Sequence, residues 1–203
     1  MKVAIIGGTG RAGREISAEL ARRGHRVTAI SRHPANAVKD PAITAVEGDV
    51  NDPERLVGLL AGHDAVVSAV MFSDTDPASL VEAVRKAGAP RYLVVGGAGS
   101  LEVAPGVPLF STPDFPDAYK PEARRGADFL QYLRGVKDLD WTFLSPSALF
   151  FVGPRRGVFR LGDDQLLADE AGESSISYAD YAIALVDEIE APRHSRQRFT
   201  VGY

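Results

Sequence analysis

Short, continuous runs of apolar residues alternate with longer amphipathic segments along most of the chain. Because the runs lack the apolar–polar alternation of a half-exposed strand, they predict strands that are buried on both faces, as in a parallel sheet. The amphipathic segments predict helices, several of which begin at a proline and end before a glycine. The expected strands are 3–6, 26–31, 43–47, 65–70, 92–95 and 141–144, and the expected helices are 11–23, 53–61, 77–87 and 121–134.

This alternation predicts an α/β fold with a doubly wound parallel sheet. The length of 203 residues suits a single domain that spans the whole chain, 1–203. Beyond residue 146 the pattern changes, and residues 147–203 read as a small C-terminal extension that completes the sheet edge and one side of a pocket. In it we expect two short strands around the Gly-Asp-Asp turn at 162–164, a helix capped by Ser177 and a closing strand in 197–203.

A long connection runs from residue 98 to residue 120 and carries four prolines with little periodicity. Loops of this length are often functional, as lids or as walls of a substrate site. This loop leaves the carboxyl end of a predicted central strand, where α/β proteins bind their ligands. We therefore expect it to border the substrate site; the alternative is an ordered surface excursion.

The turn between the first strand and the first helix reads GGTGRAG, at residues 7–13. Glycines at this spacing let the chain turn sharply, let backbone N–H groups approach a pyrophosphate and let the helix pack closely on the strand. The helix N-terminus then faces the phosphates with its positive dipole end. No Gly-Lys-Ser/Thr follows, which argues against a mononucleotide P-loop. The residues expected to bind the pyrophosphate are Gly7, Thr9, Gly10, Arg11, Ala12 and Gly13.

The end of the second strand indicates which dinucleotide is bound. An NAD site usually carries an acidic residue there, about 20 residues past the glycines, to hold the ribose 2′-hydroxyl. This chain has Ser31 and Arg32 instead. A guanidinium can grip a 2′-phosphate with two hydrogen bonds, whereas a carboxylate would repel it. We therefore expect NADPH as the cofactor, with NADH as the alternative. If Arg32 binds no ligand, it is an ordinary exposed loop residue.

Further strand ends reach the same edge of the predicted sheet. Asp49 is placed to accept a hydrogen bond from the adenine amino group, with Val50 against the ring, and a plain turn aspartate is the alternative. Small residues after the next strands let a cofactor approach closely, and Pro146 is placed to shape the nicotinamide pocket. The small and apolar residues expected along the cofactor are Ser68, Ala69, Val70, Gly97 and Ala98.

Several segments together resemble the atypical short-chain dehydrogenase/reductase family, in particular the NmrA-like NAD(P)H-binding proteins described as NADH–flavin reductases. The similarity runs nearly end to end. The resemblance implies an NAD(P)-binding Rossmann fold and hydride transfer to a free flavin (FMN or FAD) or another flat acceptor such as a quinone. In the similar biliverdin reductase B a serine near the nicotinamide ends the fifth strand, and the resemblance makes Ser100 its counterpart here. The segments are IIGGTGRAG, AISRHP, EGDVND, VVGGAGSLEV, YKPEARRGADFL, LDWTFLSPSALF and GDDQLLADEAGESSISYADYA.

The Tyr-x-x-x-Lys pair of typical short-chain dehydrogenases is absent from the sequence. A carbonyl reductase or a sugar epimerase would need such a pair to move a proton, whereas a flavin ring delocalises the charge that a hydride brings. The absence therefore favours a flavin or quinone acceptor. Tyr119 and Lys120, at the end of the long loop, are candidate catalytic residues with Ser100; a solvated lysine at a helix start is the alternative. A non-catalytic dinucleotide-binding redox sensor, or less readily an epimerase or dehydratase, remains open.

Composition narrows the remaining partners. The 23 basic and 27 acidic residues give a net charge of −4, so no general attraction to nucleic acid is expected. Without cysteine there are no disulfides or thiolate metal sites, and the four histidines lack ligand spacing, so no metal is expected. No apolar run is long enough for a membrane helix or a signal peptide. We expect a cytoplasmic protein with a flat small-molecule partner; the sequence does not indicate an oligomeric state.

Overall fold

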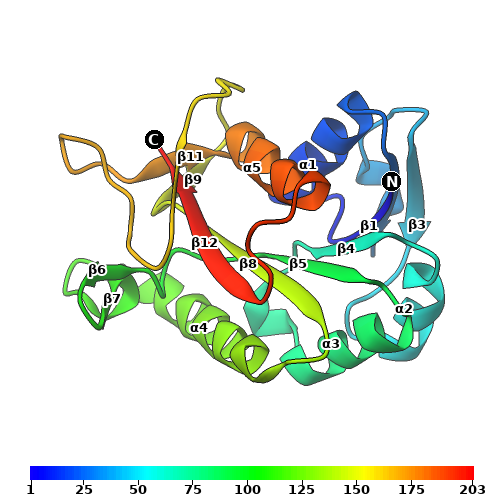
Figure 1. Cartoon of the computed structure of the whole chain (residues 1–203), viewed down its shortest axis with the longest axis horizontal. Helices are drawn as coiled ribbons and strands as arrows, with labels where there is room; N and C mark the ends of the chain where they lie inside the picture. Colours follow the sequence, from blue (N-terminus) through cyan, green and yellow to red (C-terminus); the bar gives the residue numbers. More distant parts are fainter.

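The computed structural model describes all 203 residues. Its centre is one eight-stranded sheet in the order β10-β12-β8-β5-β4-β1-β2-β3, covered by helices on both faces (Figure 1). Every neighbouring pair is parallel except β10 and β12. The strands are β1 (Lys2–Ile6), β2 (Arg26–Ser31), β3 (Ile43–Glu47), β4 (Ala65–Ser68), β5 (Arg91–Val95), β8 (Asp140–Pro146), β10 (Arg160–Gly162) and β12 (Gln197–Gly202). The predicted doubly wound α/β fold is confirmed.

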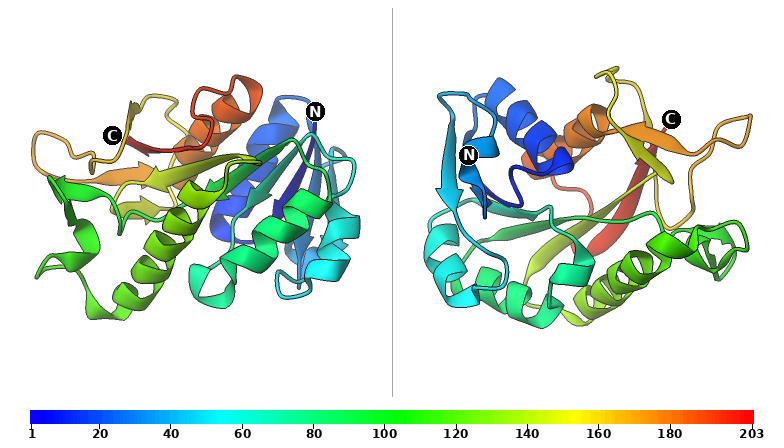
Figure 2. Two further views of the ribbon diagram at one scale, coloured as in Figure 1. Left: turned by 60° about the horizontal axis from the view of Figure 1, so that its bottom comes forward. Right: turned by 180° about the vertical axis from the view of Figure 1, so that it is seen from behind.

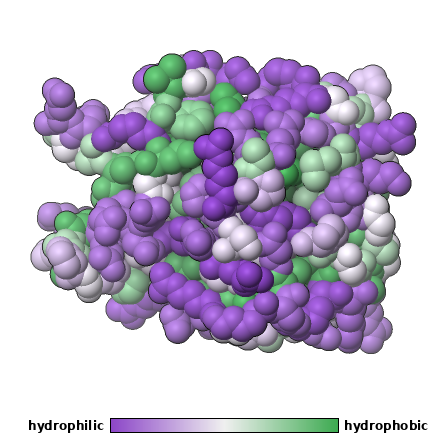
Figure 3. Space-filling model, in the orientation of Figure 1, coloured by the Kyte–Doolittle hydropathy of each residue, from purple (hydrophilic) through white to green (hydrophobic).

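Five α-helices form the two outer layers. They are α1 (Arg11–Arg22), α2 (Pro53–Leu60), α3 (Pro77–Lys86), α4 (Lys120–Gly135) and α5 (Tyr178–Glu190). Helices α1 and α5 lie on one face of the sheet, and α2, α3 and α4 lie on the other (Figure 1 and Figure 2). Hydrophilic side chains cover much of the outer surface in this view, with apolar patches between them (Figure 3). None of the helices is both long enough and apolar enough to span a lipid bilayer.

The hydrophobic core consists of two layers separated by the sheet. Alternate residues of each central strand enter opposite layers: in β1, Ala4 and Ile6 pack toward α2, α3 and α4, whereas Val3 and Ile5 pack toward α1 and α5. All four of these side chains are almost completely buried. A strand with helices on both sides therefore needs apolar residues at every position, which explains the continuous runs in the sequence.

Side-chain caps fix where several helices begin. The Asp52 carboxylate accepts a hydrogen bond from the Arg55 N–H at 3.1 Å at the start of α2. Ser177 Oγ accepts one from the Asp180 N–H at 3.1 Å at the start of α5. Such caps satisfy N–H groups that the helix itself leaves free. The predicted cap at Ser177 is confirmed, and Asp52 caps α2 in the same way.

The C-terminal extension differs from the prediction in one place. The helix and the closing strand are present as α5 and β12, and β10 pairs antiparallel with β12 at the sheet edge. The second short strand after the Gly-Asp-Asp turn was predicted wrongly. The backbone around Gln165 instead pairs with Glu102, which donates its N–H to the Asp164 carbonyl at 2.8 Å and accepts the Leu166 N–H at 2.9 Å. This partner lies in the long loop, so the segment does not fold back on β10.

The long loop 98–120 contains short regular elements. A two-stranded hairpin of β6 (Glu102–Ala104) and β7 (Val107–Pro108) is followed by two 3-10 turns, η3 (Leu109–Ser111) and η4 (Asp117–Tyr119). The hairpin lies at one end of the molecule, beside the start of α4 (Figure 1). Within the C-terminal extension, β9 (Leu149–Phe151) and β11 (Ser175–Ser177) form a further, parallel pair, and α5 follows β11 directly.

Candidate functional site

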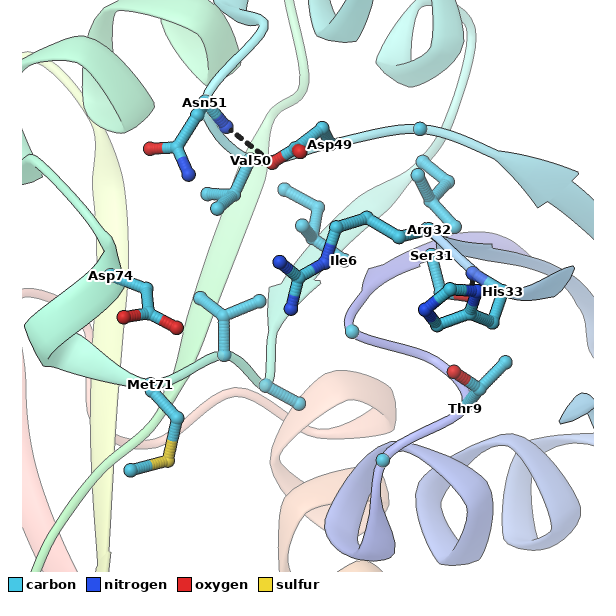
Figure 4. Close-up of a pocket in the computed structure, with 16 residues that line it drawn as sticks. Ile6, Thr9, Ser31, Arg32, His33, Asp49, Val50, Asn51, Met71 and Asp74 are labelled. Atoms are coloured by element: carbon cyan, nitrogen blue, oxygen red, sulfur yellow. Dashed lines mark hydrogen bonds between the residues drawn. The ribbon is translucent and has the colours of Figure 1, made fainter.

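A cavity of about 230 Å³ opens at the carboxyl ends of the central strands. After β1 the chain builds β2 and β3 on one side and then crosses to build β4 on the other, so the cavity lies where the strand order reverses. Open α/β sheets bind ligands at this switch point. Its walls come from the ends of β1 and β2, the residues that follow β3, and the turn η2 (Phe72–Asp74) after β4 (Figure 4).

The glycine turn forms the floor between β1 and α1. Gly7 has a φ of +82°, and a Cβ there would lie 2.3 Å from the Ala69 carbonyl oxygen. A Cβ at Gly13 would lie 2.2 Å from the Gly7 carbonyl oxygen, which brings α1 against the turn. Gly10 is less crowded, because its nearest neighbour for a Cβ is the Gly7 oxygen at 3.3 Å. Gly7 and Gly13 therefore serve close backbone packing, and Gly10 is an exposed part of the cavity wall.

The N-terminus of α1 is free to bind an anion. Its N-cap is Gly10, which supplies no side-chain hydrogen bond. The backbone N–H groups of Arg11, Ala12 and Gly13 donate no hydrogen bond in the structure, and no acidic residue lies in the first turn. Free N–H groups and the positive end of a helix dipole together favour a phosphate at this position.

A guanidinium without a partner lies in the same cavity. Arg32 makes no hydrogen bond or ion pair, and its side chain extends from the end of β2 into the cavity (Figure 4). Ser31 Oγ beside it accepts the His33 N–H at 3.1 Å, and its hydroxyl proton has no protein acceptor. A solvent-facing cation and a hydroxyl donor at this place suit a 2′-phosphate, which presents several acceptor oxygens.

The remaining walls are partly apolar. Val50 and Val70 line the cavity from two different loops, and Asp49 is held in place because its Oδ1 accepts the Asn51 N–H at 2.9 Å. Asp74, from η2, points its carboxylate toward the cavity and is not paired with a cation (Figure 4). Apolar contacts flanked by hydrogen-bond acceptors suit a heteroaromatic base that carries an amino group.

The structure brings nine of the predicted cofactor residues to this cavity. They are Gly7, Thr9, Gly10, Ser31, Arg32, Asp49, Val50, Ala69 and Val70. Seven further lining residues were missed by sequence reasoning: Ile6, Ile30, His33, Gly48, Asn51, Met71 and Asp74. Their only signal in the sequence is that they lie next to predicted strand ends. At Gly48 the structure also shows close packing, because a Cβ there would lie 2.6 Å from Ile30 Cγ2.

The other predicted cofactor residues lie outside the cavity. Ser68 is buried, and its hydroxyl is 2.9 Å from the Tyr92 hydroxyl. Pro146 is buried at the end of β8, opposite Val201 of β12. Gly97 faces open space, since the only atom near a Cβ there would be Phe72 Cε2 at 3.9 Å. The remaining residues of this group are Arg11, Ala12 and Gly13 at the start of α1 and Ala98 after β5.

The three candidate catalytic residues do not line the cavity either. Ser100 Oγ accepts a hydrogen bond at 3.1 Å from Arg198, a buried arginine that also binds Asp164. Lys120 Nζ pairs with Asp117 at 2.6 Å, which lowers the pKa of that carboxyl. The Tyr119 side chain is 66% exposed. The structure thus gives Ser100 and Lys120 polar partners within the protein, in Arg198 and Asp117.

The residues present fit a nicotinamide dinucleotide. The free N–H groups at the α1 N-terminus suit its pyrophosphate, Arg32 with Ser31 suits a 2′-phosphate, and the wall at Val50 suits adenine. No group of three or more histidine, aspartate or glutamate side chains is arranged to hold a metal ion. The arrangement therefore has the chemical features of a dinucleotide site.

Comparisons with known proteins agree with this geometry. Residues 7–192 match the model of a family described as NAD(P)H-binding. The chain is 42% identical over 211 residues to the uncharacterized protein YwnB of Bacillus subtilis, an alignment that covers 99% of this chain and 98% of that protein.

Two solved structures are similar along their whole length. SP1627 of Streptococcus pneumoniae, called a "putative NADH-flavin reductase", superposes with a TM-score of 0.83 at 39% identity and covers 100% of this chain and 99% of its own. A protein of Bacteroides thetaiotaomicron called a "putative epimerase" superposes with a TM-score of 0.94 at 37% identity and covers 100% and 96%. The two names differ in reaction, although the folds agree closely.

Proposed function

The chain belongs to the NAD(P)H-binding family, and we propose that it is an oxidoreductase. In this proposal it uses NADPH to reduce a flat acceptor, which is a free flavin (FMN or FAD) or a quinone. The choice of NADPH as cofactor is supported by one observation: the unpaired Arg32 side chain lies in the cavity next to which α1 begins with free N–H groups. NADH remains the alternative cofactor. The acceptor part rests on the sequence and on the relatives.

Each wall of the cavity has a proposed task. The N–H groups at the start of α1 bind the pyrophosphate, and Gly10 lets it approach the backbone. Arg32 and Ser31 hold the 2′-phosphate, and Asp49 accepts a hydrogen bond from the adenine amino group. The other end of the dinucleotide would run past Gly97 toward the ends of β5 and β8. These residues bind and orient the dinucleotide, and none of them transfers a proton in the proposed reaction.

The proposed acceptor follows from the proton chemistry that the chain lacks. Bound NADPH supplies a hydride. A carbonyl acceptor would then need a positioned acid such as Tyr-x-x-x-Lys, whereas a flavin or quinone ring delocalises the added charge and takes its proton from solvent. Proximity and stacking then suffice for much of the rate. The name of SP1627 is consistent with this proposal, and the name of the Bacteroides protein points to the competing one.

Ser100, Tyr119 and Lys120 remain candidates for the acceptor end of the site. Their partners in the structure are compatible with a positioning role in the long loop. Helix α4 begins directly after Tyr119, and Gly99 packs against that helix, because a Cβ there would lie 2.5 Å from the Ala123 Cβ. The loop and the helix start are therefore one structural unit, which we propose forms the acceptor wall.

A steady-state assay tests the proposal. NADPH and NADH oxidation would be followed with FMN, FAD, riboflavin, a benzoquinone and an aldehyde as acceptors. We expect flavin or quinone to accelerate NADPH oxidation and the aldehyde to have no effect. An epimerase returns the hydride to its substrate and consumes no cofactor, and a sensor binds NADPH without oxidising it. Binding without acceptor-stimulated oxidation for every acceptor would therefore reject the reductase proposal.

A further inference from the structure

Sulfur chemistry in this protein is confined to two thioethers. The chain has no cysteine and only two methionines, Met1 and Met71. Both are about half exposed, Met1 at 47% and Met71 at 55%. Met1 directly precedes β1, at the amino-end edge of the parallel strands, whereas Met71 lines the cavity at the carboxyl-end edge. The two residues are thus exposed to a similar extent, and only Met71 borders the candidate dinucleotide site.

The backbone of Met71 is firmly held. Its carbonyl oxygen accepts hydrogen bonds from Thr75 Oγ1 at 2.8 Å and from the Asp74 N–H at 3.3 Å. The next residue, Phe72, is buried against Phe129 with ring centroids 5.4 Å apart.

Helix α4 adds a second anchor to the same turn. The Glu122 carboxylate accepts the N–H groups of Phe72 and Ser73 at 2.7 and 2.8 Å. These contacts hold the Met71 segment at the cavity rim, where Figure 4 shows the sulfur, so a chemical change at the thioether takes place at the rim.

We propose that Met71 is an oxidation site that controls access to the dinucleotide cavity. The oxidant is a peroxide, which reduced flavins and hydroquinones form when they react with oxygen. The thioether sulfur attacks one oxygen of hydrogen peroxide, the O–O bond breaks, and the other oxygen leaves as water. The balanced step is R–S–CH₃ + H₂O₂ → R–S(=O)–CH₃ + H₂O. The sulfur is oxidised by two electrons and the peroxide is reduced by two.

The sulfoxide changes the cavity wall in a definite way. It replaces a flexible apolar group by a polar, branched one beside Val70, which is apolar, and Asp74, whose carboxylate offers the sulfoxide oxygen no hydrogen-bond donor. A bound dinucleotide would cover this group, so binding would have to desolvate it. We expect NADPH to bind about tenfold more weakly after oxidation. Methionine sulfoxide reductases reverse the change, so the effect is a switch.

This inference rests on the proposed position of the dinucleotide in the cavity. It does not depend on which acceptor is reduced, because its readouts are side-chain oxidation and NADPH binding. If NADPH binds but no acceptor is reduced, the proposed reaction fails and this inference is untouched. If Met71 is oxidised without any change in NADPH affinity, this inference fails and the proposed reaction is untouched.

The first experiment uses Met1 as an internal control. The protein would be treated with hydrogen peroxide in the presence and absence of NADPH at about ten times its Kd, and the oxidation of both methionines would be followed by peptide mass spectrometry. Mass action predicts that NADPH slows oxidation of Met71 about tenfold, whereas Met1 should be oxidised equally fast in both samples. Equal rates for Met71 with and without NADPH would overturn the proposal.

The second experiment measures the consequence. NADPH affinity would be determined by calorimetry before and after peroxide, for the wild type and for Met71→Leu and Met71→Gln. We expect the wild-type Kd to rise about tenfold on treatment and to return after incubation with sulfoxide reductases A and B. The Kd of each variant should not change on treatment. An equal rise in Met71→Leu, or an unchanged wild-type Kd after complete oxidation of Met71, would contradict the proposal.

Discussion

Gly7 offers a sharp test of the phosphate-binding turn, because the chain contains a matched control. Gly7 and Gly24 both have a φ of +82°, a conformation that costs a residue with a Cβ about 1 kcal/mol. At Gly24 nothing lies within 4 Å of a Cβ. At Gly7 a Cβ would lie 2.3 Å from the Ala69 carbonyl oxygen and 2.8 Å from its carbon. Only the substitution at Gly7 therefore adds a collision with backbone.

The two substitutions should differ measurably. Gly24→Ala should lower the free energy of unfolding by about 1 kcal/mol through the backbone conformation alone. Gly7→Ala pays the same cost and in addition a steric cost of about 1–3 kcal/mol, since backbone on both sides must shift. We therefore expect a loss of about 3 kcal/mol, measured by urea unfolding.

Binding separates the two variants further. Ala69 and Gly7 both line the cavity, so the shift caused by Gly7→Ala should also weaken NADPH binding by at least about tenfold, whereas Gly24→Ala should leave it within about twofold. Equal losses of stability in the two variants, or unchanged NADPH affinity in Gly7→Ala, would refute the account of this turn.

Three further predictions concern charge and capping. Arg32→Ala should weaken NADPH binding about 10–100-fold, because charge-assisted hydrogen bonds to the 2′-phosphate are lost, and NADH binding at most about twofold. Calorimetry would measure both affinities, with Arg124→Ala of α4 as a neutral control. Equal losses for the two cofactors would contradict the role of Arg32 in binding the 2′-phosphate. Burial raises the pKa of Glu19, but hydrogen bonds from arginines including Arg155 outweigh this and lower it to about 2. The ionised Glu19 carboxylate thus stabilises the folded state at pH values above 4.5, the pKa of this group in the unfolded chain. This stabilisation is lost as the pH falls from 4.5 toward 2. The stability advantage of the wild type over Glu19→Gln, from urea unfolding at pH 7 and pH 3, should therefore shrink by about 2 kcal/mol on acidification; an advantage that is constant with pH would refute it. Asp52→Ala should lower unfolding free energy by about 1 kcal/mol through loss of the α2 cap, and a change below experimental error would contradict the capping role.

The central sheet was predictable because its determinants are local. A strand covered on both faces needs apolar residues at consecutive positions, and the run 3–6 shows this directly. The caps at Asp52 and Ser177 are equally local, since each side chain binds an N–H three residues ahead. The glycine turn combines both kinds of signal, so its place between β1 and α1 followed from the sequence.

The missed features depend on contacts between distant residues. Met71 and Asp74 reach the cavity because the Glu122 carboxylate, some fifty residues further along, holds the turn after β4. The segment at Gln165 pairs with Glu102 in the long loop, so the apolar residues beside it did not indicate a local hairpin. No pattern within a short window of sequence contains these pairings.

Ser100 illustrates the same limit for function. The resemblance placed it near the nicotinamide, and the structure gives it a hydrogen bond from Arg198, which lies in the last strand of the sheet. Arg198 is buried and also binds Asp164, so three segments of the chain meet at this serine. Its role at the acceptor end remains a prediction that mutagenesis has to test.

An anaerobic single-turnover measurement tests the proposed hydride transfer from NADPH to flavin most directly. The protein with bound NADPH would be mixed with FMN in a stopped-flow instrument, and the absorbance of NADPH and the visible absorbance of the flavin would be followed together. We expect both absorbances to decrease in the same phase and in equal amounts, much faster than without protein, and we expect Arg32→Ala to slow this phase at a limiting NADPH concentration. NADPH that binds to the protein but loses no absorbance beyond the protein-free rate would contradict it.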